Sequence, residues 1–533
     1  MISEVYDIEV LSNMFSFTGY CRQTKEYHQF VIHSSRNDYE ALIKHLFRDK
    51  LIMIGYNNKG YDYPIIHHMI NHYDMYRTLS GLDLAQRIYQ KSQEIIGEEF
   101  SSVAEWNEKI IQWDLMKILH FDSVALNTSL KDIEFWMRLE SVEDMPVQHD
   151  DWITEEQIPL ILSYNKWDVH STNLLFEIVL GNTENELYKG QNKIQLRLDV
   201  KKEFKIPCLN YNDVKIGEEI NKIEYLKNNP HLKASDLKSL KPSSYELFTF
   251  GQCIPNYVSF KTKEFQNLYN SVKDVIVDTS SSDKNDKQLF PFIYNGTKYT
   301  IARGGIHSCE TGRKLIPNEN QILKDADVGS QYPNAIRKRK LYPRHLGETW
   351  LIGYVQNIQR RIEAKHLGKQ IKDPKYTSLA DTYKLALNGG GFGKAGEPKN
   401  WQYDPLVSFS CTIGNQFEIL MLIEMLELEN IHIVSANTDG IVCLFDKTLS
   451  DKYYEICHEW ENIVGNSELG QLEYTDYSKL IQTSVNDYIA IKTNGEIKLK
   501  GDFCIDVLMN KNPSMRIVPI AIKEYFVNNV PIE

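Results

Sequence analysis

The sequence lacks the cysteine pairs that build small extracellular or zinc-binding domains. Its eight cysteines are scattered over 533 residues, and no two of them form a Cys-x-x-Cys pair. This spacing indicates neither a zinc module nor a disulfide framework. The sequence also lacks a secretory leader at its start, Met1-Ile2-Ser3-Glu4-Val5, and we find no apolar run long enough to cross a membrane. We therefore expect a protein of the reducing cytoplasm that has no membrane partner.

An overall positive charge is absent as well. The chain has 60 Lys and Arg against 72 Asp and Glu, a net charge of -12. The distribution is uneven, however, because the stretch from Val328 to Lys375 holds eleven Lys and Arg against three acids. Such a stretch is typical of a phosphate-binding surface, although a solvated helix face is the alternative. A chain of this length is too long for one core, so we expect several domains.

One predicted β-hairpin organises the second half of the chain. Its apolar arms are Ile431–Ala436 and Ile441–Phe445, and a polar turn between them carries Asp439. Upstream, another strand is predicted to end at Asp327, and Ser330 is expected to cap a helix that opens after it. Two carboxylates at neighbouring strand ends can hold two divalent cations about 4 Å apart. An ordinary buried hairpin and an unrelated surface acid are the alternative.

A second group of acids lies near the N-terminus. The alternation in Val5–Val10 puts Asp7 and Glu9 on one face of a predicted strand. A further apolar strand, Leu51–Tyr56, is followed closely by Asp62. These acids are the first members of a set that a later helix completes.

The remaining acid of this group is predicted to lie on that helix. Pro159 opens a helical pattern in which Tyr164 and Asp168 are four positions apart and therefore share a face. Four converging carboxylates are costly unless cations neutralise them, which favours a metal site. Asp114 is a fifth candidate, and we interpret it as structural.

Two basic helices are predicted between Asp327 and Asp439. Arg361 and Lys365 share a face of the first helix, and Lys384 and Asn388 share a face of the second. A glycine-rich segment, Gly389–Gly393, follows the second helix. An antiparallel pair of such helices would present its cations toward one groove, which suits a triphosphate.

These residues together resemble family B (α-like) DNA polymerases, in a phage-type variant that carries a DEDDy 3′–5′ exonuclease. Asp327-x-x-Ser-x-Tyr-Pro resembles motif A, Asn437-Thr-Asp-Gly resembles motif C, and Lys384-x-x-x-Asn388 resembles motif B. The three exonuclease motifs resemble Asp7-x-Glu9, Asn57-x-x-x-Tyr-Asp62 and Tyr164-x-x-x-Asp168. The motifs occur in the family's order, and the likeness extends over most of the chain from Asp7 to Gly501.

The resemblance implies an α/β multidomain fold. It places an RNase H-like exonuclease domain at 1–180, a connecting region at 181–310 and short helical fingers at 351–395. It places a right-hand polymerase palm, an antiparallel sheet with helices, at 311–350 and 396–510. The last residues, 511–533, would then be the start of a thumb whose remainder is missing from this chain.

The resemblance also implies roles for individual residues. The polymerase carboxylates would be Asp327 and Asp439, and the exonuclease residues would be Asp7, Glu9, Asp62, Tyr164 and Asp168. Each active site would bind two Mg²⁺ or Mn²⁺ ions, through Asp327, Val328 and Asp439 in one site and through Asp7, Glu9, Asp62 and Asp168 in the other. Nucleotide would contact Tyr332, Arg361, Lys365, Lys384 and Asn388. DNA would contact Gly304, Gly305, Lys498, Lys500 and Gly501.

Several positions depart from the family's pattern. Ala302 stands where a Tyr-x-Gly-Gly loop has its tyrosine, so an ordinary turn is an equal alternative there. Gly389 and Phe392 replace a serine and a tyrosine of motif B, with one additional glycine, so the loop geometry stays open. Asn437 replaces the first acid of motif C, which predicts slightly weaker metal binding.

The resemblance implies a template-directed DNA polymerase that adds dNTPs to a primer and proofreads its product. Its partners would be primer-template DNA, dNTPs and a thumb-supplying chain or processivity factor, in the host cytoplasm if a bacteriophage encodes it. Two other functions stay open. One is a stand-alone metal-dependent 3′–5′ exonuclease with a vestigial palm, and the other is a non-catalytic nucleic-acid-binding replication factor.

Overall fold

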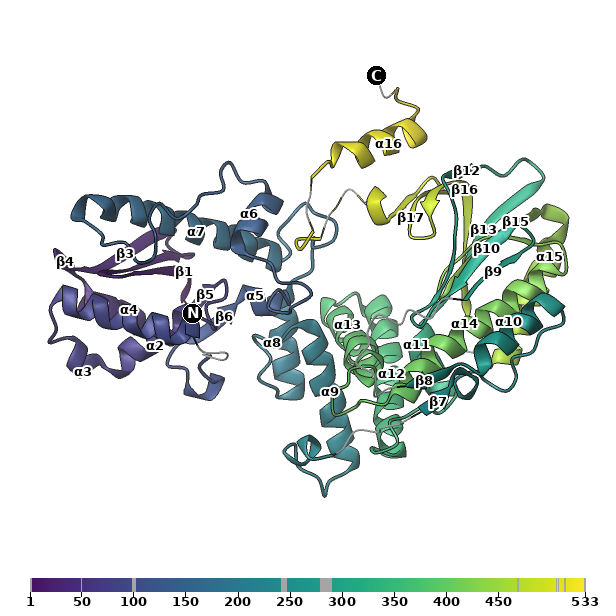
Figure 1. Ribbon diagram of the computed structural model, residues 1–533, viewed down its shortest axis with the longest axis horizontal. Helices are drawn as coiled ribbons and strands as arrows, with labels where there is room; N and C mark the ends of the chain where they lie inside the picture. Colours follow the sequence, from purple (N-terminus) through teal and green to yellow (C-terminus); the bar gives the residue numbers. More distant parts are fainter. Residues whose placement is uncertain are drawn as a thin grey trace. The chain divides into compact units, whose positions relative to one another are not determined.

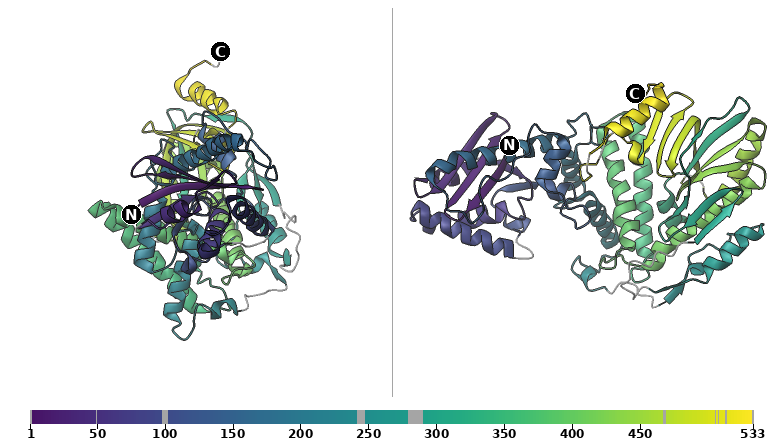
Figure 2. Two further views of the ribbon diagram at one scale, coloured as in Figure 1. Left: turned by 90° about the vertical axis from the view of Figure 1, so that its left-hand side faces the viewer. Right: turned by 45° about the horizontal axis from the view of Figure 1, so that its top comes forward.

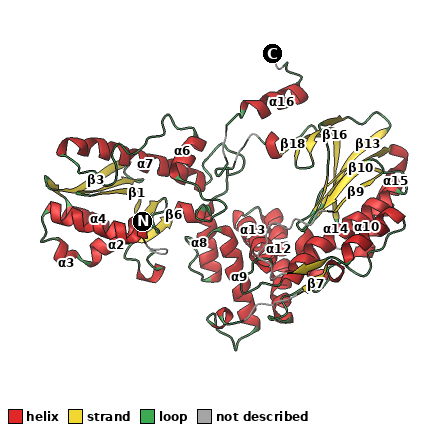
Figure 3. Cartoon of the chain, viewed as in Figure 1, coloured by secondary structure: helices red, strands yellow, loops and turns green. Residues whose placement is uncertain are grey.

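A computed structural model of the protein describes residues 2–48, 50–97, 102–240, 247–278, 290–466, 469–504, 506, 508–511 and 514–531. Over these residues the chain is a mixed α/β protein with several sheets and many helices, as expected (Figures 1 and 3). It divides into two compact units, each with its own sheet and core. The first unit comprises Met1–Asp213 and Asp506–Ser514, and the second comprises Val214–Ile505 and Met515–Glu533.

The first unit is built on a six-stranded sheet in the order β4-β3-β2-β1-β5-β6. The first four strands are successively antiparallel, whereas β5 and β6 run parallel to β1. The strands are β1 (Ile2–Leu11), β2 (Met14–Cys21), β3 (Glu26–His33), β4 (Arg36–Asn37), β5 (Leu51–Gly55) and β6 (Ile111–Asp114). The two strands predicted in this part of the sequence therefore exist and lie side by side.

Helices cover both faces of this sheet (Figure 1). Tyr6, Ile8 and Val10 of β1 belong to a core shared with one set of helices, and Val5 belongs to a second core shared with α7. Residues alternate between faces along a strand, so Asp7 and Glu9 face the α7 side. The helices of the first core are α1 (Tyr39–Leu46), α2 (Asp62–Asn71), α3 (Tyr73–Tyr76) and α4 (Gly81–Gly97). Those of the second are α5 (Leu115–Ile118), α6 (Leu130–Met137), α7 (Ile158–Val179) and α8 (Lys193–Phe204).

The second unit is built on a seven-stranded antiparallel sheet, which Figure 2 shows from two further sides. Its order is β14-β15-β13-β16-β17-β18, and β12 also pairs with β16. The strands are β12 (Arg313–Leu315), β13 (Gln321–Val328), β14 (His432–Ala436), β15 (Gly440–Asp446), β16 (Leu472–Ser484), β17 (Asp487–Lys492) and β18 (Ile497–Lys500). The predicted hairpin is β14 and β15, and β13 lies directly beside it.

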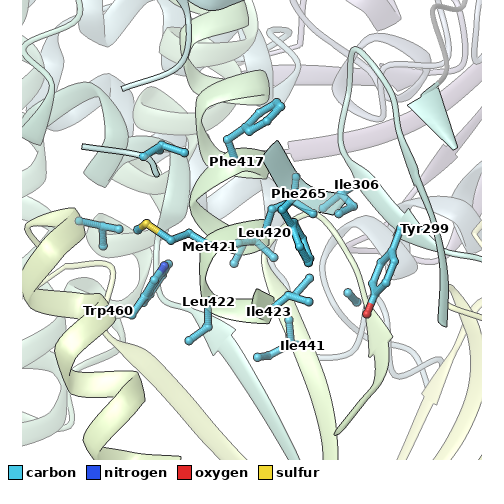
Figure 4. Close-up of a cluster of buried hydrophobic side chains, with 14 of the residues drawn as sticks. Phe265, Tyr299, Ile306, Phe417, Leu420, Met421, Leu422, Ile423, Ile441 and Trp460 are labelled. Carbon is cyan, nitrogen blue, oxygen red and sulfur yellow. The ribbon is translucent and has the colours of Figure 1, made fainter. Parts of the chain in front are cut away.

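Two helices, α14 (Pro405–Glu427) and α15 (Ser450–Val464), pack on one face of this sheet, and α10 (Lys263–Lys273) joins the same core through β9 (Phe290–Tyr294). Figure 4 shows Leu420 and Ile423 of α14 among Ile441 of the sheet and Trp460 of α15. Since Ala326, Val328 and Ile441 point into this core, the alternate residues Asp325 and Asp327 point to the opposite face.

Helix α14 corrects one expectation from the sequence. By length and composition it is apolar enough to span a membrane, contrary to the expectation that no apolar run is long enough. In its most apolar window, 83% of the helix is buried inside the protein. The core of a large unit accounts for this composition, because a helix that is buried on all sides is apolar on all sides.

A second core in this unit is helical. It joins α9 (Asp213–Asn228), α11 (Gln331–Lys338), α12 (Glu348–Ile371) and the end of α13 (Pro374–Leu387). Only two residues connect α12 to α13, and the two helices pack along each other as the sequence predicted. The glycine-rich segment Asn388–Gly393 continues α13 as a π-helix.

Smaller elements complete the second unit. A three-stranded sheet, in the order β11-β10-β9, lies beside β14 and contributes Tyr299 and Ile306 to the same core, where Figure 4 labels both. The remaining elements are β7 (Leu247–Thr249), β8 (Ile276–Asp278), β9 (Phe290–Tyr294), β10 (Thr297–Ile301), β11 (Ile306–Ser308) and α16 (Ile517–Asn528). The helix predicted at Ala521–Phe526 lies within α16.

Candidate functional sites

Three carboxylates meet on the α7 side of the first sheet. Asp7 and Glu9 come from β1 and Asp168 comes from α7, and one oxygen of each lies within 4.8 Å of the others. The strand supplies its two acids from alternate positions, and the helix crosses above them. Together with Asp62, these residues form the N-terminal acidic site.

Asp62 approaches the same strand from another direction. It is the first residue of α2, and its Oδ1 accepts a hydrogen bond of 3.3 Å from the backbone N–H of Ile8. It is not one of the three acids within 4.8 Å of each other, but its charge raises the pKa of Asp7. Tyr164, one turn before Asp168 on α7, lies beside the same acids.

The electrostatics of the N-terminal acidic site are unfavourable without a cation. Burial, reinforced by the neighbouring acids, raises the pKa of Asp7 well above its usual range and that of Glu9 to about 8. Burial likewise raises the pKa of Asp62 to about 7, and that of Asp168, although Lys131 opposes the latter shift. Clustered carboxylate oxygens are the donors that Mg²⁺ and Mn²⁺ prefer, so the residues present fit divalent cations.

Sequence reasoning missed two residues of this site. The Nζ of Lys131, on α6, lies 2.8 Å from Asp168 Oδ1 and 4.7 Å from the centre of the Tyr164 ring. The side-chain amide of Asn165 donates a 2.6 Å hydrogen bond to Asp7 Oδ2. The Ser129 capping box could have located the start of α6, but no local pattern shows that Lys131 points at α7.

Asp114 has the structural role that we expected. It is fully buried, and its carboxylate caps α5 by accepting the backbone N–H groups of Met116 and Lys117. It also accepts the backbone N–H groups of Asn57 and Lys59, in the turn that precedes Asp62. Asp114 therefore supports the turn that positions Asp62.

A second pair of carboxylates meets in the second unit. Asp327 lies on β13 directly opposite Gly440, the first residue of β15, and a Cβ at position 440 would collide with the Asp327 carboxylate. The backbone N–H of Val328 donates a 2.7 Å hydrogen bond to the carbonyl of Asp439. The structure thus brings Asp327, Val328 and Asp439 together, and these three form the C-terminal acidic site. Gly440 is required there because only glycine leaves room for Asp327.

This second site carries less negative charge than the first. Burial and the neighbouring Asp325 raise the pKa of Asp327 to about 6, whereas Lys498 opposes the shift. Asn437 contributes no charge, and its side-chain oxygen accepts a 3.2 Å hydrogen bond from the backbone N–H of Asp439. Asn437 therefore stabilises the turn. Two carboxylates and a carbonyl fit divalent cations, with fewer charges than the N-terminal acidic site offers.

Ser330 does not cap the following helix, contrary to our expectation. Helix α11 begins at Gln331, and Ser330 adopts the left-handed conformation (φ 54°) without a capping hydrogen bond. In this conformation its hydroxyl instead accepts a 3.1 Å hydrogen bond from Arg361. The hydrogen bond from Arg361 thus attaches the turn after β13 to α12.

A pocket of about 450 Å³ lies beside this connection. Ser330, Arg361, Lys365 and Lys369 contribute to its wall, so two of the predicted nucleotide-binding residues are together. Of the described residues that line the pocket, none is Lys384 or Asn388. Lys384 and Asn388 lie together at the end of α13, where the Asn388 amide donates to the Lys384 carbonyl.

The backbone geometry of the glycine-rich segment, which the sequence left open, is defined in the structure. Its additional glycine is accommodated by a π-helix, in which the ring of Phe392 stacks on Tyr332. Side chains satisfy the carbonyls at this irregular turn: the Tyr354 hydroxyl donates to Leu387, and the Gln402 amide donates to Gly390. The segment is therefore held from several sides.

The loop with Gly304 and Gly305 is a tight hairpin between β10 and β11. It packs against the turn of the C-terminal acidic site, because a Cβ at Gly305 would collide with the side chain of Thr438. A Cβ at Gly304 would meet nothing within 4 Å. The backbone there is a turn that supports the residue next to Asp439, and DNA contact by Gly304 and Gly305 stays a prediction.

Lys498 and Lys500 lie on β18, paired with β17, and Gly501 directly follows that strand. Gly501 has a φ of 63° and leaves room for Asp487 that a side chain would fill. Lys498 reaches the C-terminal acidic site, with its Nζ 3.9 Å from Asp327 Oδ2. The structure therefore brings Lys498 to the acids.

Comparison with models of protein families and with curated proteins gives no match. Among solved structures, the chain is similar to the family B DNA polymerase from the hyperthermophilic archaeon Pyrobaculum calidifontis, at 12% identity and a TM-score of 0.43. The alignment covers 98% of this chain and 65% of that chain, so the protein spans about two thirds of the length of that polymerase. Similarity at this level decides neither fold nor activity, so the function has to be inferred from the two acidic sites.

Proposed function

We propose that the protein is a template-directed DNA polymerase that adds dNTPs to a primer 3′ end and carries a 3′–5′ exonuclease. One observation carries the proposal: Asp327 and Asp439 meet at the end of a buried antiparallel sheet, beside a pocket that holds Arg361 and Lys365. Paired carboxylates beside a cationic pocket suit phosphoryl transfer from a triphosphate. In this proposal the seven-stranded sheet is the palm, α12 and α13 are the fingers, and the first unit is an RNase H-like exonuclease.

In the polymerase reaction, Asp327, Asp439 and the carbonyl of Val328 would hold two Mg²⁺ ions. When bound, these ions would lower the pKa of the primer 3′-hydroxyl and neutralise the leaving pyrophosphate. Arg361 and Lys365 would bind the triphosphate oxygens and orient the α-phosphate for in-line attack. Tyr332, fixed by Phe392, would lie against the sugar and exclude a 2′-hydroxyl.

In the exonuclease reaction, Asp7, Glu9, Asp62 and Asp168 would hold the second pair of ions, which would supply the charge stabilisation of hydrolysis. Burial raises the pKa of Tyr164, so its hydroxyl keeps its proton and can donate a hydrogen bond that orients the attacking water. Asn165 would keep Asp7 turned toward the ions through its hydrogen bond.

One observation favours a second candidate, a stand-alone exonuclease with a vestigial palm. The N-terminal acidic site has four acids, whereas the C-terminal acidic site has two, with Asn437 at the turn. A protein that has lost polymerase activity would keep the first set and dispense with the second. A non-catalytic replication factor would need neither set, so the buried charges of the first site argue against it.

Incubation of the protein with a labelled primer-template and Mg²⁺ separates the three functions. A polymerase with an exonuclease lengthens the primer when dNTPs are present and shortens it when they are absent. A stand-alone exonuclease shortens it under both conditions. An unchanged primer under both conditions, from folded protein that retains DNA binding, would contradict both enzymatic functions.

A further inference from the structure

A third carboxylate lies behind the C-terminal acidic site. Asp325 is two residues before Asp327 on β13 and points to the same face of the sheet, where its side chain is 9% exposed. Its Oδ2 accepts a hydrogen bond from the hydroxyl of Tyr477 and a 3.2 Å hydrogen bond from Lys498 Nζ. The Lys498 Nζ lies 3.2 Å from the Tyr477 hydroxyl too, so the three groups form a closed triangle.

Three strands contribute to this triangle. Asp325 comes from β13, Tyr477 from β16 and Lys498 from β18, so no local sequence signal links them. The Lys498 ammonium also lies 5.7 Å from the centre of the Tyr488 ring. A buried carboxylate is costly to leave unpaired, and here a hydroxyl and an ammonium satisfy it. The arrangement fixes the ammonium at one place.

That place borders the C-terminal acidic site. A pocket of about 270 Å³ is lined by Asp325, Asp327, Asp439 and Lys498, among other residues. Lys498 Nζ is 3.9 Å from Asp327 Oδ2, farther than it is from Asp325 Oδ2. If an uncharged residue replaced Asp325, the remaining carboxylate near this ammonium would be that of Asp327. A lysine paired with Asp327 would neutralise one of only two acids available for cations.

The lack of a charge on Asn437 makes the competition between Lys498 and a cation for Asp327 more important. Asn437 cannot balance a lysine, and its side chain is engaged by the backbone N–H of Asp439. Lys500 adds a further positive charge to the pocket wall. Three acids face two lysines in this pocket, and with an uncharged residue at position 325 two acids would face two lysines.

We propose that Asp325 is a positioning residue that, together with Tyr477, holds Lys498 away from Asp327 and keeps Asp327 available for a divalent cation. The inference rests on the proposed function of this site. Lys498 stays at the pocket edge, where its ammonium can contact the primer, while its charge is balanced from behind. Asp325 is thus a third acid that binds no metal and compensates for the uncharged Asn437.

The test measures Mn²⁺ binding by electron paramagnetic resonance, without DNA, in an Asp7→Ala/Glu9→Ala background that removes ions from the N-terminal acidic site. Asp325→Asn should weaken Mn²⁺ binding about tenfold, as loss of a partner behind a metal ligand commonly does. Adding Lys498→Met to Asp325→Asn should restore the affinity, because the competing ammonium is gone. Unchanged affinity in Asp325→Asn, or no recovery in the combined variant, would overturn the proposal.

Kinetics on the chain with an intact N-terminal site give a second readout. Asp325→Asn should raise the Mg²⁺ concentration for half-maximal extension while the KM for primer-template changes little. Lys498→Met alone should raise the KM for primer-template and change the Mg²⁺ requirement little, because it removes a DNA contact while Asp325 already keeps the ammonium away from Asp327. A simple folding defect would lower kcat in both variants without this split. Should Asp325→Asn fail to fold, Tyr477→Phe carries the same test with a smaller expected effect, and an unchanged Mn²⁺ affinity there overturns the proposal.

The two proposals fail in different ways. If the wild-type chain extends no primer but the Mn²⁺ pattern holds, the polymerase function is refuted and the positioning role stands. If the chain extends primers but Asp325→Asn binds Mn²⁺ normally, the polymerase stands and the positioning role is refuted. A background variant that binds no Mn²⁺ at the C-terminal acidic site would refute both.

Discussion

The ring of Tyr332 lies flat on the ring of Phe392, with centroids 4.0 Å apart and ring planes 8° apart. Tyr332 belongs to α11, which follows β13 and its Asp327. Phe392 belongs to the π-helical segment. This stacking fixes the orientation of both rings. The residue expected to contact the sugar of an incoming nucleotide is therefore held by the segment that the sequence showed as irregular.

Tyr332→Ala is expected to let ribonucleotides enter the polymerase reaction. Removal of the ring opens room for a 2′-hydroxyl, and we expect discrimination between dNTP and rNTP to fall on the order of tenfold to hundredfold. Single-nucleotide incorporation of each nucleotide measures kcat/KM. Phe392→Leu is the matched variant, which keeps Tyr332 but removes its support, and it should have a smaller effect. Unaltered discrimination in Tyr332→Ala would remove the role of this ring.

Asp439→Asn is expected to abolish primer extension, by about three powers of ten or more, and to leave 3′ degradation intact. The reason is the loss of one of only two carboxylates in the C-terminal acidic site, while the N-terminal acidic site lies in the other unit. Extension with dNTPs and degradation without them measure the two activities. Loss of degradation in a folded variant would show that the two sites are not independent.

Asp7→Ala combined with Glu9→Ala is expected to give the opposite pattern. These residues supply two of the three acids within 4.8 Å of each other, so degradation should be lost while extension persists. Release of the 3′ nucleotide from a labelled single strand measures the effect. Asp114→Asn is a useful contrast, because it changes an acid that caps α5 and supports the turn before Asp62, so it should reduce thermal stability and lower degradation only partly. Full degradation by the combined variant would mean that neither acid is a ligand.

Gly305→Ala is expected to lower extension by roughly tenfold to hundredfold, because its Cβ would push Thr438 and with it the turn that positions Asp439. Gly304→Ala is the matched control, since a Cβ there meets nothing within 4 Å. Degradation should be unaffected in both. A comparison of extension rates checks the pair, and equal rates would contradict the packing explanation. Thr438→Ala should partly rescue Gly305→Ala.

The stability of the metal-free protein is expected to fall as the pH rises. Burial raises the pKa of Glu9 from 4.5 to about 8 and that of Asp62 from 3.8 to about 7. A folded state that holds protons more tightly than the unfolded state is stabilised at low pH, and this stabilisation is lost as pH rises through the folded pKa. We therefore expect the Tm of the first unit to decline between about pH 5 and pH 8.

Thermal unfolding with and without Mn²⁺ checks this expectation. The ion should raise the Tm more at pH 8 than at pH 6, because it replaces protons that the acids have lost. Glu9→Gln removes one titrating group and should flatten the decline. A Tm that rises steadily with pH in the metal-free protein would contradict the assigned direction of these shifts.

The sequence by itself determined the elements that carry the two acidic sites. The alternation in Val5–Val10 predicted that Asp7 and Glu9 share one face of a strand. The spacing of four residues predicted that Tyr164 and Asp168 share one face of a helix. The apolar arms around Asp439 predicted the hairpin. All of these are short-range consequences of the period of a strand or a helix, which a single chain segment contains.

Only the tertiary structure decided which side chains from distant segments meet. Lys131 reaches Asp168, and Lys498 reaches Asp325, across different helices and strands whose pairing depends on how whole sheets and helices pack. The left-handed conformation of Ser330 was missed because capping preference depends only on the residues next to the helix end. The Arg361 side chain that Ser330 contacts comes from α12, which is distant in the sequence. Local periodicity fixes which face a residue occupies, but the register between strands and the burial of charge are settled by packing over the whole unit.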